Sequence, residues 1–558
     1  MNRKDFFMRA LFFVIWLFAS FPLLGEGIQK ETYRSTISTS RYEVLDLTFR
    51  SSYNRQLNPF IVDFEAMVTA PSGKSMRVPG FYNGDKEWII RFSADEEGIY
   101  KYVTSSEIKT LNNKKGSIKV GANTEPDKKG GVVISKQHPR YFEYQDGSPY
   151  FLMAYECDWL YALDYKNEQG IPRTWKLLEQ LEENGFNQVV MNVFSYDIDA
   201  PHPAWTKDEK LKEYPQYDFG APQDIFPFLG NNEQPDFSSL NVIFFQKLDR
   251  TIAALNDKNI ISHLMIYVWN KKVNWPDMYT EADDMYYDYI VKRYGAFPNM
   301  LFDVSKEAIL YGRADDEYIL ERIQRIRDNN PFDRLVTVHD YGFCVRHKDK
   351  VDFLSRQDWK FRCYDHMIET HRKVKDKPVF NIEHGGYEYS DFEVFPGSYM
   401  NAESCLRRNY ECLFAGIYST YYWQGASWNV IVWDPEQLPK DHYRPKYQYF
   451  KYLTDFFTTY NFADYAPLEF KGRIQEFCLK HNDKEEYLFY IPKELYRKMT
   501  WGIMKDDEEV IHYKWYNTLT GEMTTEFKKT KDTFGYQSPW HQEADAILIL
   551  RRSSETVN

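Results

Sequence analysis

Residues 175–194 read WKLLEQLEENGFNQVVMNVF and combine the two patterns that decide the fold. The segment 175–184 is amphipathic and stops at Gly185, and glycine is the residue that most often follows the end of a helix. The segment 187–194 is a short apolar run with the length and composition of a buried strand. A helix followed closely by a buried strand is the repeating unit of a parallel α/β fold.

The same alternation extends from about residue 140 to residue 460. Amphipathic segments separate the apolar runs, and in one of them Leu240, Phe244, Leu248 and Ile252 keep a single helical face. The last helix is expected at residues 443–460. Eight strands with helices between them predict a (β/α)8 TIM barrel over residues 135–464. The candidate strands are residues 150–155, 187–194, 260–269, 300–305, 335–339, 351–355, 378–383 and 416–423.

An open, doubly wound sheet is the alternative for this region. It usually needs fewer strands, and no GxGxxG motif follows the first strand. The barrel is therefore the favoured fold.

The sequences on both sides of the barrel have the alternating patterns that are typical of β domains. Apolar and polar residues alternate in 45–50, 62–66 and 88–92, and this predicts an N-terminal β-sandwich over residues 28–125. Glycines at turn-like intervals separate these runs, namely Gly73, Gly80, Gly84 and Gly98. A polar, glycine-rich linker is expected at residues 124–131. Short strand patterns at 487–491, 515–516 and 546–550 predict a C-terminal β-sandwich over residues 465–558.

The N-terminus has the pattern of a secretory signal peptide over residues 1–27. Arg3, Lys4 and Arg9 precede the uncharged run 10–24, and small residues follow it. The run is too short for a transmembrane helix, although an uncleaved N-terminal anchor is the alternative. We therefore expect a secreted, periplasmic or cell-surface protein with no transmembrane span after removal of the signal.

Composition excludes several classes of protein. The 558 residues include 82 acidic and 70 basic side chains, a net charge of −12. Without clustered Lys and Arg the chain is not expected to bind nucleic acid, because phosphate neutralisation needs such clusters. A hydrophobic fraction of 43% excludes a disordered chain. The six Cys stand singly and no CxxC or HExxH motif occurs, so we expect no disulfide framework, no metal site and no cofactor.

The strand ends carry the candidate site residues, because reactive groups in barrels lie at the C-terminal ends of the strands. These ends are rich in carboxylates, amides and aromatic rings, in a chain with 44 Tyr, 40 Phe and 14 Trp. Aromatic rings stack on sugar rings, and the polar groups hydrogen-bond hydroxyls, so the expected partner is a carbohydrate. The candidate substrate-binding residues are Asp158, Trp159, Asn192, Tyr267, Trp269, His339, Gln357 and Trp423.

Two glutamates at strand ends resemble the catalytic pair of clan A glycoside hydrolases: Glu307 after the fourth strand and Glu383 at the end of the seventh. More closely, the sequence is similar to the apiosidase-like barrel family. The motifs that carry the similarity are SPYFL at 148–152, GFN at 185–187 and EHG at 383–385. In addition, the N-terminal region resembles an uncharacterised domain that precedes such barrels, and the C-terminal region resembles a small sandwich named for collagen binding.

The resemblance implies an exported, retaining glycoside hydrolase of poly- or oligosaccharides, with Glu383 as nucleophile and Glu307 as acid/base. One position departs from the clan pattern, because Lys306 stands where an Asn usually precedes the acid/base. The lysine could serve an anionic substrate, Asp303 could replace Glu307, or the barrel could have lost catalysis. Two functional alternatives follow: a non-catalytic carbohydrate-binding protein, or a polysaccharide lyase in which His339 or a Tyr is the base.

Overall fold

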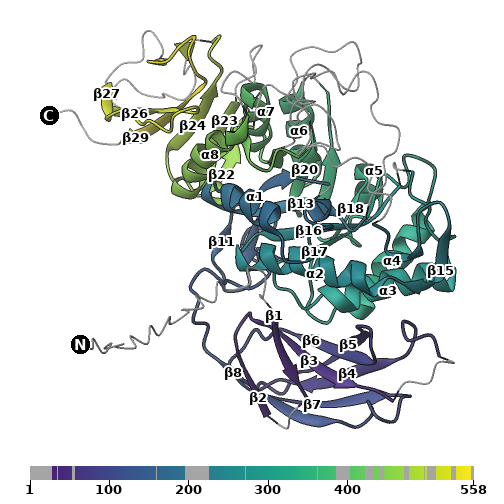
Figure 1. Cartoon of the computed structure of the whole chain (residues 1–558). Helices are drawn as coiled ribbons and strands as arrows, with labels where there is room; N and C mark the ends of the chain where they lie inside the picture. Colours follow the sequence, from purple (N-terminus) through teal and green to yellow (C-terminus); the bar gives the residue numbers. More distant parts are fainter. Residues whose placement is uncertain are drawn as a thin grey trace, which may run out of the picture.

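Three bodies follow one another along the chain: an N-terminal β domain, a central barrel and a C-terminal β domain (Figure 1). The predicted signal peptide lies outside the described residues. The computed structural model describes residues 28–33, 36–52, 57–158, 160–194, 225–269, 272–360, 362–384, 402–421, 431–438, 445–469, 477–495, 497–498, 510–529 and 536–553.

Eight parallel strands form the barrel, which confirms the predicted fold class. Their hydrogen-bonded order is β18-β17-β16-β13-β12-β21-β20-β19. The ring closes between β18 and β19, where the Asp352 amide donates to the Val336 carbonyl at 2.9 Å and the Thr337 hydroxyl donates to the Phe353 carbonyl at 2.9 Å. The strands are β12 (Met153–Glu156), β13 (Gln188–Asn192), β16 (Ile261–Val268), β17 (Met300–Lys306), β18 (Val336–His339), β19 (Leu354–Gln357), β20 (Val379–Glu383) and β21 (Tyr418–Tyr421).

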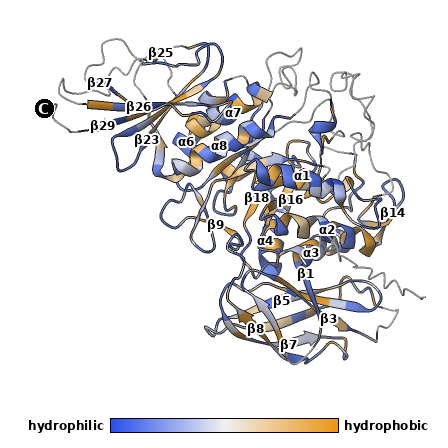
Figure 2. Ribbon diagram, turned by 60° about the vertical axis from the view of Figure 1, so that its left-hand side comes forward, coloured by the Kyte–Doolittle hydropathy of each residue, from blue (hydrophilic) through white to orange (hydrophobic). Residues whose placement is uncertain are grey.

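Helices follow the strands and cover the outside of the ring (Figure 1). Side-chain oxygens of Asn241, Thr280, Asp315 and Asp340 accept backbone N–H groups at the starts of α2 to α5, which is the usual N-cap interaction. These helices carry both hydrophobic and hydrophilic residues (Figure 2). They are α1 (Pro172–Glu183), α2 (Val242–Asp257), α3 (Glu281–Tyr294), α4 (Asp316–Asn329), α5 (Tyr341–Arg346), α6 (Cys363–Lys373), α7 (Ala402–Phe414) and α8 (Tyr447–Thr459).

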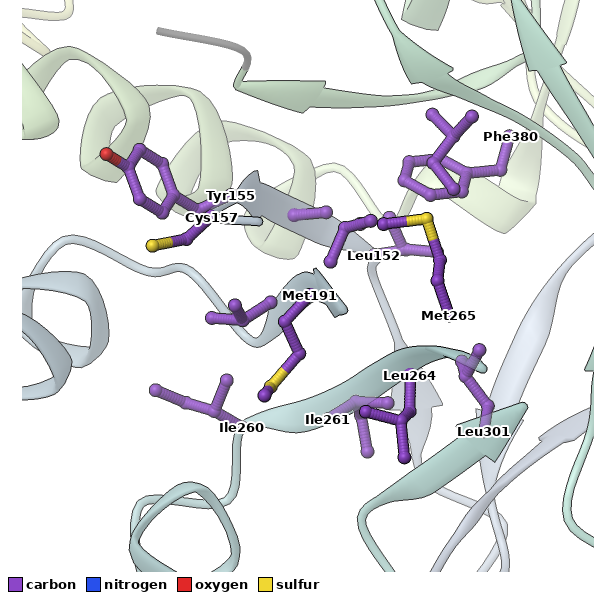
Figure 3. Packing of buried hydrophobic residues seen from close by; sticks show 14 of the residues in the cluster. Leu152, Tyr155, Cys157, Met191, Ile260, Ile261, Leu264, Met265, Leu301 and Phe380 are labelled. Atoms are coloured by element: carbon purple, nitrogen blue, oxygen red, sulfur yellow. The ribbon is translucent and has the colours of Figure 1, made fainter. Parts of the chain in front are cut away.

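Gly185, just after α1, shows why the opening stretch folds as it does. Its φ of +80° is in the left-handed region, and a Cβ there would lie 2.9 Å from Thr454 on α8. The chain then enters β13, whose five residues are all buried. Side chains from several strands pack together in the barrel, including Met191, Met265 and Phe380 (Figure 3).

The strands of the N-terminal β domain pair in one eight-stranded sheet in the order β1-β3-β6-β5-β4-β7-β8-β2. β5 joins the two halves, because its start pairs with β4 and its end pairs with β6. Gly80 was expected at a turn but lies inside β5, where a Cβ would be 2.4 Å from the Phe64 ring. The strands are β1 (Ile28–Thr32), β2 (Thr36–Ser40), β3 (Val44–Arg50), β4 (Phe64–Thr69), β5 (Ser75–Tyr82), β6 (Glu87–Phe92), β7 (Gly98–Ser106) and β8 (Lys115–Gly121).

Short strands complete the connections. The expected linker, residues 124–131, has no helix or strand, and a three-stranded sheet precedes the barrel. The first predicted strand, 150–155, is divided between β11 and β12. The connecting strands are β9 (Val132–Ile134), β10 (Phe142–Tyr144), β11 (Pro149–Tyr150), β14 (Phe228–Gly230) and β15 (Pro235–Leu240).

The C-terminal β domain contains a six-stranded antiparallel sheet in the order β22-β23-β24-β29-β26-β27, and a two-stranded sheet of β25 and β28. Within the part of the chain that the structure describes, no helix has the length and apolar character needed to cross a membrane. The strands are β22 (Tyr465–Pro467), β23 (Phe477–His481), β24 (Glu486–Ile491), β25 (Arg497–Lys498), β26 (Val510–Asn517), β27 (Phe527–Lys529), β28 (Tyr536–Gln537) and β29 (Ala546–Ser553).

Candidate active site

The backbone is irregular at the C-terminal end of β17. Its pairing with β18 shifts register between Asp303 and Lys306, and Lys306 then pairs with His339. The next residue, Glu307, has a φ of +60°, in the left-handed region that non-glycine residues rarely occupy. Such strained residues are concentrated at functional sites, where the surrounding structure holds them in place. The strain therefore marks this strand end as a candidate site.

A buried lysine lies at the centre of the site. The Lys306 Nζ atom donates a hydrogen bond to Glu156 Oε1 at 2.9 Å and lies 2.9 Å from Glu383 Oε2 and 3.6 Å from Asp158 Oδ2. The side chains of all four residues are at most 5% exposed. The ends of β12, β17 and β20 therefore meet at one ammonium group.

The charges of this cluster are strongly coupled. Burial opposes the charged form of Lys306, yet Asp158, Glu156, Glu383 and Glu307 together hold the pKa of its ammonium well above the usual 10.5. Burial also raises the pKa of Glu156 well above its usual value, and the charges of Glu383 and Asp158 add to this effect although Lys306 opposes it. The lysine is thus protonated, and its single positive charge is outnumbered by the carboxylates around it.

His339, on β18, faces the same cluster. Its Nε2 atom lies 3.6 Å from Glu383 Oε2. Burial lowers the pKa of His339 well below 6.5, and the positive charge of Lys306 lowers it further. The imidazole is therefore neutral at neutral pH and does not add a second positive charge.

Several buried polar atoms near these strand ends have no hydrogen-bond partner among the described residues. Both side-chain atoms of the Asn192 amide, both ring nitrogens of His339, Trp269 Nε1 and Asp158 Oδ1 are of this kind. Buried polar groups in proteins are normally hydrogen-bonded, and exceptions call for an explanation. These atoms would find their hydrogen-bond partners if the hydroxyls of a sugar bound here.

The structure brings four of the predicted residues together: Asp158, Glu307, His339 and Glu383. Asn192 lies buried at the end of β13, and the half-buried Gln357 is in register with Glu383 on the neighbouring strand. Trp159 and Trp423 lie outside the described residues.

Tyr267 has a different environment from the one expected. Its hydroxyl donates to Asp283 of α3 at 2.6 Å, and its ring stacks on Tyr286 of the same helix. Its side chain is fully buried in the packing between β16 and α3, and its contact with substrate stays a prediction. Trp269 lies against Tyr267, with the ring centroids 5.0 Å apart, and is 8% exposed. A position near a strand end does not by itself determine which way a side chain points.

Asp303, the alternative acid/base, is part of the barrel frame. Its carboxylate faces His263 Nε2 at 3.0 Å and accepts the backbone N–H groups of Ser305 and His339. The residue is fully buried. Through these contacts the Asp303 carboxylate stabilises β17 at its register shift, just before Lys306.

The sequence did not assign Glu156 to the site, and it marked Lys306 as a departure from the clan pattern that could serve an anionic substrate. Both residues stand at strand ends, and this was the available signal. Among the described residues, no three His, Cys, Asp or Glu side chains are grouped so that they could hold a metal ion.

Comparisons with known proteins agree with this geometry. A family model described as "Apiosidase-like, catalytic domain" matches residues 136–541, and a model of a domain of unknown function, DUF5060, matches residues 38–107. A search of curated proteins finds no match.

Solved structures show the same fold. A proposed glycoside hydrolase from Bacteroides vulgatus ATCC 8482 aligns with a TM-score of 0.70 at 19% identity, over 93% of this chain and 100% of that chain. A glycoside hydrolase family 5 protein from the same organism aligns with a TM-score of 0.52 at 16% identity, over 77% of this chain and 94% of that chain.

Proposed function

The chain belongs to the apiosidase-like catalytic domain family and is a glycoside hydrolase, and from this premise we propose that it is an exported enzyme that cleaves glycosidic bonds in a polysaccharide or oligosaccharide with retention of configuration. The observation that carries the proposal is that Glu383 and Glu307 both act electrostatically on the buried Lys306 ammonium. Glu383 Oε2 lies 2.9 Å from its Nζ atom, and Glu307 is the next residue in the chain. A retaining mechanism needs two carboxylates on either side of one bond.

In this mechanism Glu383 attacks the anomeric carbon while Glu307 donates a proton to the leaving oxygen. A covalent glycosyl–enzyme ester forms and the leaving alcohol departs. Water then attacks the same carbon, Glu307 takes its proton as a base, and the Glu383 carboxylate is released. We assign Asp158, Asn192, Trp269 and His339 to the hydroxyls of the bound sugar, because each has a buried polar atom without a hydrogen-bond partner among the described residues.

The test begins with a screen of plant, algal and host glycans with product analysis. On the best substrate, Glu383→Ala and Glu307→Ala should each lower kcat by at least about 1,000-fold while the proteins stay folded. The matched control is Glu369→Ala, since Glu369 is an exposed glutamate on α6. NMR of the first product formed should show retained anomeric configuration.

Near-normal activity of Glu383→Ala would contradict the catalytic assignment. Inverted product would contradict the retaining mechanism but leave the hydrolase intact. An unsaturated, ultraviolet-absorbing product would instead indicate a lyase.

Export rests on the signal-like sequence of residues 1–27. Fractionation of cells that express the full chain should place the mature protein outside the cytoplasm, with an N-terminus near residue 28 by mass spectrometry. A full-length chain in the cytoplasm would contradict this part of the proposal.

A further inference from the structure

Lys306 is already paired with protein carboxylates. An ammonium group has three N–H donors, and three carboxylates lie within 3.6 Å of its Nζ atom, those of Glu156, Glu383 and Asp158. The lysine side chain is 3% exposed. An acidic group on a substrate would have to compete with these carboxylates for the lysine.

We propose that Lys306 is a positioning residue that holds Glu383 through an ion pair and is itself anchored by Glu156 and Asp158. This inference rests on the proposed function, in which Glu383 is the nucleophile. It gives the lysine a role inside the protein and not in binding an anionic sugar. It also adds Glu156, on β12, to the set of residues on which catalysis depends.

The charges around Lys306 support this role. The groups that face it are Glu156 and Asp158 at the end of β12, Glu307 after β17, His339 on β18 and Glu383 on β20. His339 is neutral, so one positive charge faces four carboxylates. A uronate in contact with this cluster would meet an excess of negative charge, and we infer that the sugar bound here carries no acidic group.

Because Glu156 lies beside Lys306, the amide of an Asn side chain could not take the place of the lysine. An Asn at position 306 could donate a hydrogen bond but could not neutralise the buried carboxylates of Glu156, Asp158 and Glu383. Lys306 and Glu156 therefore form a coupled pair, 2.9 Å apart. Replacing one of them alone by a neutral residue changes the net charge of the cluster, whereas replacing both leaves it unchanged.

The experiment compares Lys306→Met, Glu156→Gln and the double variant, with Lys348→Met as the control. Lys348 forms an exposed ion pair with Asp376, so its loss should change neither measurement. Thermal unfolding is measured from pH 5 to pH 8 and needs no substrate. The pH–rate profile is measured on the glycan that the wild-type enzyme cleaves best.

We expect Lys306→Met to lower kcat by at least about 100-fold with KM within about threefold, because the nucleophile is displaced while the sugar contacts remain. Without the ammonium, the buried carboxylates bind protons more readily in the folded than in the unfolded state, so the folded variant gains stability as pH falls. Its Tm deficit should therefore be largest at pH 8 and shrink toward pH 5. The acidic limb of its pH–rate profile should move to higher pH, and the double variant should recover part of the lost Tm.

A Tm deficit that is equal at all pH values, with an unchanged pH–rate profile, would overturn the proposal, since only packing would then be lost. A loss of activity confined to uronate-containing glycans would overturn it in favour of substrate binding by the lysine. Failure of the proposed function has a different signature: Glu383→Ala stays active, or no glycan is cleaved, whatever the unfolding curves of the Lys306 variants show.

Discussion

Two buried ionic clusters among the described residues differ in how well their charges are paired: one lies between the N-terminal β domain and the barrel, the other at the barrel strand ends. At the domain interface, Arg91 of β6 bonds Asp46 of β3 at 2.7 Å and Asp249 of α2 at 3.1 Å, and Arg293 of α3 bonds Asp249 at 2.7 Å. Two arginines face two aspartates. Burial opposes the charge on Asp249, but Arg293 and Arg91 hold its pKa below the usual value.

The interface cluster is balanced and satisfied, whereas the site cluster is neither. The arginines also donate to the Arg293 carbonyl, to Tyr289 and to Asn83, and among the described residues the four interface side chains leave no buried polar atom without a partner. At the strand ends, one lysine serves several carboxylates. A satisfied buried network specifies structure, whereas unbalanced networks are found mainly at functional sites and are compensated elsewhere in the protein. Substitutions should therefore affect stability at the interface and turnover at the strand ends.

The largest effect is expected for Glu383→Gln. The amide cannot act as a nucleophile, so kcat should fall by at least about 1,000-fold. Stability should be unchanged or higher, because one of several crowded carboxylates is removed. Calorimetry and kinetics on the same preparation test both parts. A large loss of stability would show that this cluster is structural like the interface cluster.

Arg91→Met should have the opposite effect to Glu383→Gln, lowering stability and leaving activity unchanged. It leaves Asp46 buried without its counter-charge, and breaking a buried pair in this way costs about 3–5 kcal/mol of unfolding free energy. The kcat of the folded molecules should be unchanged. Urea unfolding measures the loss, and Arg77→Met is the control, since the exposed Arg77–Glu65 pair contributes less than about 1 kcal/mol. A fall in kcat with unchanged stability would break the comparison.

Asp303→Asn tests the boundary between frame and site within the barrel. It weakens the contact with His263 and the support of two backbone amides, so we expect a loss of about 1–3 kcal/mol in stability. The kcat should stay within about tenfold of the wild-type value. A fall as large as that of Glu307→Ala would instead make Asp303 the acid/base.

Local signals predict the barrel well. Its strands are buried on both faces, so they read as apolar runs, and residues 260–269 correspond closely to β16 (Ile261–Val268). Strand boundaries are harder to predict where buried residues lie outside strands. Residues 351–355 were expected as a strand, but β19 spans Leu354–Gln357, because Val351 and Phe353 are buried in the segment before it.

The site was predictable only in part. The positions of Glu307 and Glu383 at strand ends follow from the strand–helix alternation and the family motifs. The contact between Lys306 and Glu156 does not, because it joins residues 150 positions apart through the register of β17 and its shift. The packing of Tyr267 against Tyr286 of α3 is likewise a contact between two elements that no local pattern marks. The interface cluster joins four residues of four different elements, and no local pattern marks them.

The smallest expected effect separates the two clusters by pH. His339 is buried and neutral, and its pKa is well below 6.5, so the unfolded chain binds a proton that the folded chain does not as pH falls below 6.5. The stability of the wild-type protein should therefore decrease on acidification, and His339 should account for about 1 kcal/mol of that decrease between pH 8 and pH 5.5. In His339→Gln this part should vanish, as read from urea unfolding at the two pH values. His138→Gln, at an exposed position, should keep the wild-type slope. If His339→Gln also keeps it, the imidazole is charged in the folded protein, and the site would then hold a second positive charge and resemble the balanced interface more than its geometry indicates.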